Sequence, residues 1–148
     1  MTPRERLAET TFDSLDDMSI AYAAEAVRSA PRDLQRSLDY SAASILALER
    51  ILDTLSPPPA IQDDQDYLTR LWGSYFGETL RRQFGGQWSM SVYPGSEFAV
   101  PTLEINGSRL YPMLKVFRRL TLGASEDLLP FHRLVSERLA TAQAPKPQ

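Results

Sequence analysis

The sequence predicts an α+β fold: about five helices with a three-stranded antiparallel β-meander packed on a central helix. Three observations support this prediction. Residues 67–84 repeat apolar side chains at helical spacing in two adjoining stripes. Apolar and polar residues alternate over 88–93, as in a half-buried strand, and a second strand is expected over 98–105. Asn106-Gly107 is a strong signal for a two-residue hairpin turn, because both positions of such a turn need positive φ.

The central helix is expected to be covered on more than one side, because most of its circumference is apolar. Its large apolar side chains are Leu68, Leu71, Trp72, Tyr75, Phe76, Leu80 and Phe84. Gly73 and Gly77 lie four residues apart, and each costs about 1 kcal/mol relative to Ala in a helix interior. We therefore expect both glycines to permit close approach of another element of the same chain. Gly85-Gly86 is expected to end the helix.

Two helices are predicted before the central one. Residues 1–13 are polar and mixed in charge, so they are expected to be flexible or loosely helical. Ser14 is expected to cap a helix that ends near Arg28, and Ser41 to cap the next. The inner faces predicted from helical spacing are Leu15, Met18, Tyr22 and Ala26 in the first helix and Ile45, Leu48, Leu52 and Leu55 in the second. The run 56–59, Ser-Pro-Pro-Pro, is interpreted as a stiff connector.

The hairpin turn predicts a register for the last two strands. A two-residue loop pairs Leu103 with Leu110 and Glu104 with Arg109. The apolar pair then lies on one face and the opposite charges on the other. In the first strand, the side chains expected on the buried face are Trp88, Met90 and Val92.

Two more helices follow the meander. Pro112 suits the first position of a helix that Gly123 ends. The inward side chains of this helix are expected to be Leu114 (or Met113), Phe117 and Leu120. Ser125 is expected to cap the last helix, where Pro130 kinks or offsets the opening by a residue. Its predicted inner face consists of Leu128, His132, Val135 and Leu139.

Length and composition favour one domain over residues 14–141, with a flexible segment before it and a disordered tail at 142–148. The 148 residues include no cysteine, which excludes disulfides, thiol catalysis and cysteine-based zinc sites and suits a reducing cytoplasm. There is no apolar run near 18 residues and no apolar signal-peptide region at the start of the sequence. A cytoplasmic location is therefore expected.

Several segments resemble a family of uncharacterised bacterial proteins, a domain of unknown function. The LDYSxxSI pattern starts at Leu38, and a GxYxGE…RRxxGGxW core covers residues 73–88. The core positions are Gly73, Tyr75, Gly77, Glu78, Arg81, Arg82, Gly85, Gly86 and Trp88. Residues 101–105, 111–123 and 125–135 extend the resemblance. It implies the fold above and a bacterial setting, and it transfers no catalytic residue.

The candidate partner-binding residues are Glu78, Arg81, Arg82, Tyr93, Lys115, Arg118 and Arg119. Glu78 lies on a mostly apolar helix, where desolvation would raise its pKa and suit it to acid or base chemistry. The favoured interpretation is an ion pair with Arg82 one turn later. His132 has no metal-binding or catalytic motif beside it, so we expect a core histidine bonded to the backbone.

A basic stripe of Lys115, Arg118 and Arg119, with Arg81 and Arg82 as possible neighbours, could clamp a phosphate or carboxylate. A solvated helix face is the favoured alternative, because no glycine-rich phosphate loop accompanies the stripe. The acidic cluster Asp63, Asp64 and Asp66 lacks EF-hand spacing and is interpreted as the start of the central helix. No metal, no cofactor and no catalytic residue is expected.

The predicted function is a non-catalytic protein-binding module, such as an immunity protein that binds a secreted toxin or effector, or an adaptor. The net charge of −3 favours another protein of basic charge and argues against nucleic acid or an anionic membrane as the partner. The alternative is a small-ligand or anion-sensing domain that uses the basic stripe with Tyr93 or Tyr111. An enzyme built around Glu78 is the third possibility.

Overall fold

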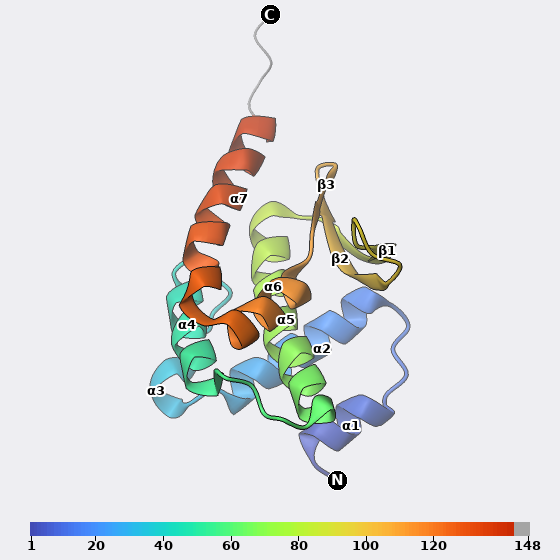
Figure 1. Ribbon diagram of the computed structural model, residues 1–148, viewed down its shortest axis with the longest axis vertical. Helices are drawn as coiled ribbons and strands as arrows, with labels where there is room; N and C mark the ends of the chain where they lie inside the picture. The colour runs from blue at the N-terminus through green and yellow to red at the C-terminus, as the bar shows by residue number, and fades with distance from the viewer. Residues whose placement is uncertain (144–148) are drawn as a thin grey trace, which may run out of the picture.

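The computed structural model describes residues 1–143, which form the predicted α+β fold (Figure 1). The elements, in chain order, are α1 (Pro3–Glu9), α2 (Leu15–Ser29), α3 (Arg32–Gln35), α4 (Ser44–Leu55), α5 (Gln62–Phe84), β1 (Gln87–Val92), β2 (Ala99–Ile105), β3 (Ser108–Leu110), α6 (Pro112–Leu122), the 3₁₀ helix η1 (Gly123–Glu126) and α7 (Leu128–Gln143). The described part has two more helices than the five expected, the short α1 and α3.

Helix α5 is the central helix, as predicted. It packs against α2 on one side and α6 on another, and residues 71–80 are all buried. A Cβ atom added at Gly73 would lie 2.7 Å from Met113 Cα of α6. At Gly77 it would lie 2.2 Å from the Trp88 indole of β1. Both glycines therefore permit close approach within the chain, as expected from the sequence.

The buried carboxylate of Glu78 ties α5 to β1. It accepts a hydrogen bond from Trp88 Nε1 at 2.9 Å and a bidentate pair from Arg81 at 2.7 and 2.8 Å. Gly85 and Gly86, with φ of 81° and 110°, reverse the chain between the two elements. This reversal brings the indole back over Gly77, so residues 73–88 form a local packing unit.

The three strands form an antiparallel meander in the order β1-β2-β3. The predicted register is confirmed: Leu103 pairs with Leu110, and Glu104 pairs with Arg109. Leu103 is fully buried, whereas the Glu104 and Arg109 side chains form an exposed ion pair at 3.3 Å. The length of the two-residue loop at Asn106-Gly107 is sufficient to predict this register.

The expectation that Met90 and Val92 are buried is wrong. Only Trp88 of the predicted β1 face is buried, and the exposed fractions of Met90 and Val92 are 57% and 54%. Alternation along a strand sets the side to which a side chain points. Whether that side is covered depends on helices that pack over it, and here they cover only the Trp88 end.

The start of α2 agrees with the sequence, but that of α4 does not. Ser14 caps α2, since its Oγ accepts from Asp17 N at 3.0 Å. Helix α4 begins at Ser44, three residues after the predicted cap. Tyr40 has a φ of 65°, and Ser41 Oγ accepts from Ser44 N at 3.2 Å, which holds residues 41–43 in a turn. The predicted inner face of α4 is correct: Ile45, Leu48 and Leu52 are buried and Leu55 is partly buried.

Helix α6 begins at Pro112 and ends before Gly123, as predicted. Its inward face differs in part, because Met113, Val116 and Leu120 are buried whereas Phe117 is exposed. Helix α6 packs against α5 and also contacts β2, α4 and α7. A single apolar stripe therefore does not predict which of its side chains are buried.

The predicted cap of the last helix is wrong. Ser125 lies within η1, and α7 begins at Leu128. The cap comes from another helix: Glu49 Oε1 of α4 accepts hydrogen bonds from Leu128 N and, at 2.9 Å, from Leu129 N. Pro130 fits near the helix start because it has no N–H to satisfy there.

Helix α1 and the end of α7 lie at opposite ends of the view in Figure 1. Within the segment 1–13, α1 is held by an ion pair of 2.7 Å between Arg4 and Asp64 of α5. Of the predicted tail 142–148, residues 142 and 143 belong to α7, and 144–148 lie outside the described residues. Among the described residues, no helix is long and apolar enough to cross a membrane.

Candidate functional site

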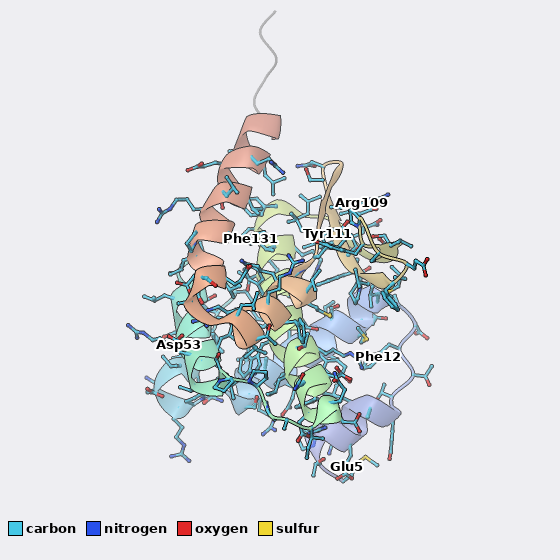
Figure 2. All side chains as sticks on the ribbon, in the orientation of Figure 1. Glu5, Phe12, Asp53, Arg109, Tyr111 and Phe131 are labelled. Carbon is cyan, nitrogen blue, oxygen red and sulfur yellow. The ribbon has the colours of Figure 1, made fainter. Side chains whose placement is uncertain are left out.

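A pocket of about 250 Å³ lies between α6, α7 and β3. Figure 2 shows Phe131 on α7 and Tyr111 at the start of α6 bordering this region, with Arg109 nearby on the sheet. Its polar lining consists of Tyr93, Ser108, Arg109, Tyr111, Lys115, Arg118 and Arg138, and its apolar lining of Leu110, Leu114, Phe131, Leu134, Val135 and Leu139. The volume lies just below the range of about 300–1,000 Å³ for pockets that hold drug-sized ligands, so it suits a smaller molecule.

One face of α6 supplies the cationic wall. Tyr111, Leu114, Lys115 and Arg118 follow the i, i+3, i+4, i+7 spacing and all line the pocket. The buried side chains of α6 lie on the neighbouring face. The helix therefore presents one face to the core and another to the pocket.

The same spacing on α7 supplies the opposite wall, which is apolar except for Arg138. Phe131, Leu134, Val135 and Arg138 repeat at i, i+3, i+4 and i+7, and each lines the pocket. Phe131, Leu134 and Arg138 are not among the site residues predicted from the sequence. The helical spacing of these residues indicates that they share one face of α7, but it does not indicate which other element that face contacts.

Two of the four lining cations have an acidic partner. Lys115 Nζ lies 2.6 Å from Glu126 Oε2, and the Lys115 side chain is only 14% exposed. The hydrogen bond from Lys115, together with the nearby positive charges, holds the pKa of the Glu126 carboxyl below its usual value. Arg109 pairs with Glu104 across the hairpin.

The other two cations, Arg118 and Arg138, have no carboxylate at ion-pair distance in the described part of the chain, although the charge of Arg118 contributes to the lowered pKa of Glu126. Arg118 Nη2 donates to the Tyr93 hydroxyl at 3.0 Å, and within the described residues neither Arg118 nor Arg138 forms an ion pair. The lining, as far as the structure describes it, includes no Asp, Glu or His. The pocket therefore carries a local surplus of positive charge in a chain whose net charge is −3.

Aromatic rings border these cations. The Tyr93 and Tyr111 rings meet edge to face, with centroids 4.9 Å apart and planes at 80°. The Arg118 guanidinium lies 5.6 Å from the Tyr93 ring centroid, and Lys115 Nζ lies 5.4 Å from that of Phe131. Contacts of this kind orient a cation over a ring. An anion bound here would contact both positive charge and aromatic surface.

The structure therefore brings together Tyr93, Lys115 and Arg118 from the predicted site residues, together with Tyr111, which the anion-sensing alternative also named. It does not bring Glu78, Arg81 or Arg82 to this pocket. Glu78 pairs with Arg81, at i+3, and not with Arg82 as predicted. The Arg82 guanidinium instead lies 3.5 Å from the Tyr40 ring centroid. These three side chains take part in contacts within the fold.

Arg119 was predicted to belong to the basic stripe, but it points into the protein and is 2% exposed. Its guanidinium forms ion pairs with Glu49 at 2.9 Å, Asp127 at 3.0 Å and Asp53. Burial lowers the pKa of Arg119, but hydrogen bonds to Asp53 and Glu49 outweigh burial and leave this pKa above its ordinary value. One residue along a helix turns a side chain by about 100°, which separates Arg119 from Arg118.

His132 also differs from its prediction. It is half-buried, and its Nε2 lies 2.7 Å from the side-chain oxygen of Gln83 on α5, where a backbone partner was expected. Burial lowers the pKa of the imidazole. The ring lies beside Phe84, with centroids 6.3 Å apart, and does not line the pocket.

No group of three potential metal ligands occurs among the residues that the structure describes. Asp63 and Asp64 lie in the first turn of α5, as predicted for a helix start. Asp66 accepts a hydrogen bond from Gln62 at 2.8 Å.

No protein-family model, curated protein or solved structure matched the chain in the comparisons with known proteins. The resemblance to uncharacterised bacterial proteins therefore remains a prediction. The geometry of the pocket is the basis for a functional proposal.

Proposed function

We propose that this domain binds a small anion with an apolar body in the pocket between α6, α7 and β3. The observation that carries the proposal is the pair of arginines, Arg118 and Arg138, that line an apolar hollow without a carboxylate partner among the described residues. A charge-assisted hydrogen bond is about twice as strong as a neutral one. The anionic end of a ligand would supply the missing partner.

The shape of the lining supports an amphiphilic ligand. Leu134, Val135 and Leu139 of α7 lie on the apolar wall, and Lys115 and Arg118 of α6 lie on the cationic one. A purely hydrophilic anion would leave the apolar wall in contact with water. A neutral hydrocarbon would leave the arginines without an anionic partner. In this proposal the domain binds its ligand without transforming it, as a sensor or carrier does.

Replacing Arg118 with glutamine tests this proposal. We expect Arg118→Gln to weaken binding of a small carboxylate such as hexanoate by about 10- to 100-fold, because a hydrogen bond between charged groups is lost. Isothermal titration calorimetry measures the affinity. Arg133→Gln removes the same charge from an exposed position of α7 outside the pocket and should leave the affinity unchanged. Equal losses in both variants would indicate a general charge effect and contradict the proposal.

A protein partner is the second candidate, and a separate surface favours it. Strand β1 lies at an edge of the sheet and exposes Met90 and Val92, and Phe98 in the adjoining turn region is 75% exposed. An edge strand with exposed apolar side chains can accept an extended segment of another protein. An immunity protein or an adaptor would use such a surface.

The second candidate predicts that exposed β1 side chains determine partner capture. We expect a protein captured from the native host by the wild-type chain to be lost with the double substitution Met90→Ser and Val92→Ser. Leu122→Ser, which alters an apolar residue of similar exposure at the end of α6, is the control. Capture that survives the double substitution would assign the partner to another surface.

A further inference from the structure

We propose that the ligand of this pocket is an aromatic carboxylate, whose ring lies against Tyr111 and Phe131 and whose carboxylate binds Arg118. This inference rests on the proposed function and narrows it to one chemical class. It depends on the arrangement of three aromatic rings and on the hydrogen bonds that fix the arginine.

Aromatic rings form part of the pocket wall. Tyr93 and Tyr111 meet at 80°, which forms a corner between two aromatic surfaces. A third ring can lie parallel to one of them and present its edge to the other, which are the two arrangements that aromatic pairs prefer. Phe131, on α7, lines the same pocket opposite α6. A saturated ring of equal size would fill the space without these contacts.

The position of the cation also supports this ligand class. Arg118 Nη2 is held by the Tyr93 hydroxyl at 3.0 Å, so its guanidinium is already oriented at the aromatic corner. A guanidinium has five N–H donors, of which this contact uses one. The remaining donors can hold the two oxygens of a planar carboxylate side by side. Tyr93 thus acts as a positioning residue for Arg118.

The choice of a carboxylate over a phosphate follows from the backbone. Phosphate sites commonly combine cations with free backbone N–H groups at a helix N-terminus. Here α6 starts with Pro112, which has no N–H, so its first turn has one backbone donor fewer than an ordinary helix start. The unpaired cations that line the pocket, Arg118 and Arg138, are then the main donors to an anion, and a planar carboxylate matches a guanidinium. The volume of about 250 Å³ also favours a single ring over a nucleotide or a long acyl chain.

A matched pair of ligands tests the inference. Calorimetry with 3-phenylpropanoate and 3-cyclohexylpropanoate compares an aromatic and a saturated ring of the same length and charge. We expect the aromatic ligand to bind about 2- to 10-fold more tightly, as aromatic pairing beyond area burial implies. Equal or reversed affinities, with both still weakened by Arg118→Gln, would overturn the aromatic assignment while the proposed function stands. Failure of both ligands and of hexanoate to bind would overturn the proposed function as well.

Three variants test which side chains determine the preference for the aromatic ligand. Phe131→Leu should remove most of the difference between the two ligands while the circular dichroism spectrum stays that of a folded protein. Leu134→Ala, on the same wall, should weaken both ligands equally. Tyr93→Phe keeps the ring but removes the hydroxyl that orients Arg118, so we expect weaker binding of both ligands. An undiminished aromatic preference in Phe131→Leu, or tighter binding of phenyl phosphate than of 3-phenylpropanoate to the wild type, would contradict the assignment.

Discussion

Replacing Arg119 with alanine is expected to destabilise the domain by about 3–5 kcal/mol, as measured for broken buried ion pairs. The reason is Glu49, which is buried beside Arg119 and would lose its cationic partner there. Asp53 and Asp127 would lose the same partner, but their side chains are exposed enough for water to replace it. Urea denaturation followed by circular dichroism measures the change in the free energy of unfolding.

A neighbouring variant and a rescue make this prediction specific. Arg118→Ala removes an adjacent arginine that faces the pocket, and its cost should stay within about 0.5 kcal/mol. Adding Glu49→Gln to Arg119→Ala should recover part of the loss, because the amide oxygen can still accept from Leu129 N without a buried charge. If Arg119→Ala and Arg118→Ala cost the same, the ion-pair cluster does not stabilise the fold as the geometry implies.

The contrast between these two arginines shows where sequence reasoning reaches its limit. The sequence predicts one basic stripe for both, because the pattern of a single helix does not show which other elements each side chain contacts. The buried partner of Arg119 is Glu49, 70 residues earlier in the chain. Long-range partners of this kind depend on how helices pack, so they are not visible in local patterns.

Features with local causes were predicted correctly. The pairing of Glu104 with Arg109 follows from the length of the turn at Asn106-Gly107. Ser14 caps α2 because an oxygen side chain three residues before a free N–H can reach it. In both cases the determining contact lies within a few residues of the signal.

The pocket combines both kinds of cause. Spacing on one helix places Lys115 and Arg118 together, and both are predicted site residues. The opposite wall, with Phe131 and Arg138, depends on where α7 lies, and that position is fixed partly by the capping contact from Glu49. No local pattern in residues 128–143 identifies that cap.

Replacing Gly77 with alanine is expected to destabilise the domain by about 1–3 kcal/mol, and Gly77→Leu is expected to prevent folding. A Cβ at this position would lie 2.2 Å from the Trp88 ring, which cannot move without losing its 2.9 Å hydrogen bond to Glu78. Glycine to alanine in a helix interior otherwise stabilises by about 1 kcal/mol. The sign of the change in thermal midpoint therefore distinguishes a packed glycine from one that faces open space.

A double-mutant cycle with Trp88→Leu tests whether the indole is the cause. The smaller leucine leaves room beside residue 77, so the cost of Gly77→Ala should fall in the Trp88→Leu background and approach the gain that helix propensity alone predicts. The coupling free energy from urea denaturation should be about 0.5–3 kcal/mol, the range for residues in contact. A cycle that closes with no coupling would place the clash elsewhere, and a stabilised Gly77→Ala single variant would refute the close approach of α5 and β1. A non-zero coupling free energy would show that Gly77→Ala destabilises the domain through its contact with the Trp88 ring, because the two substitutions of the cycle meet only at that contact.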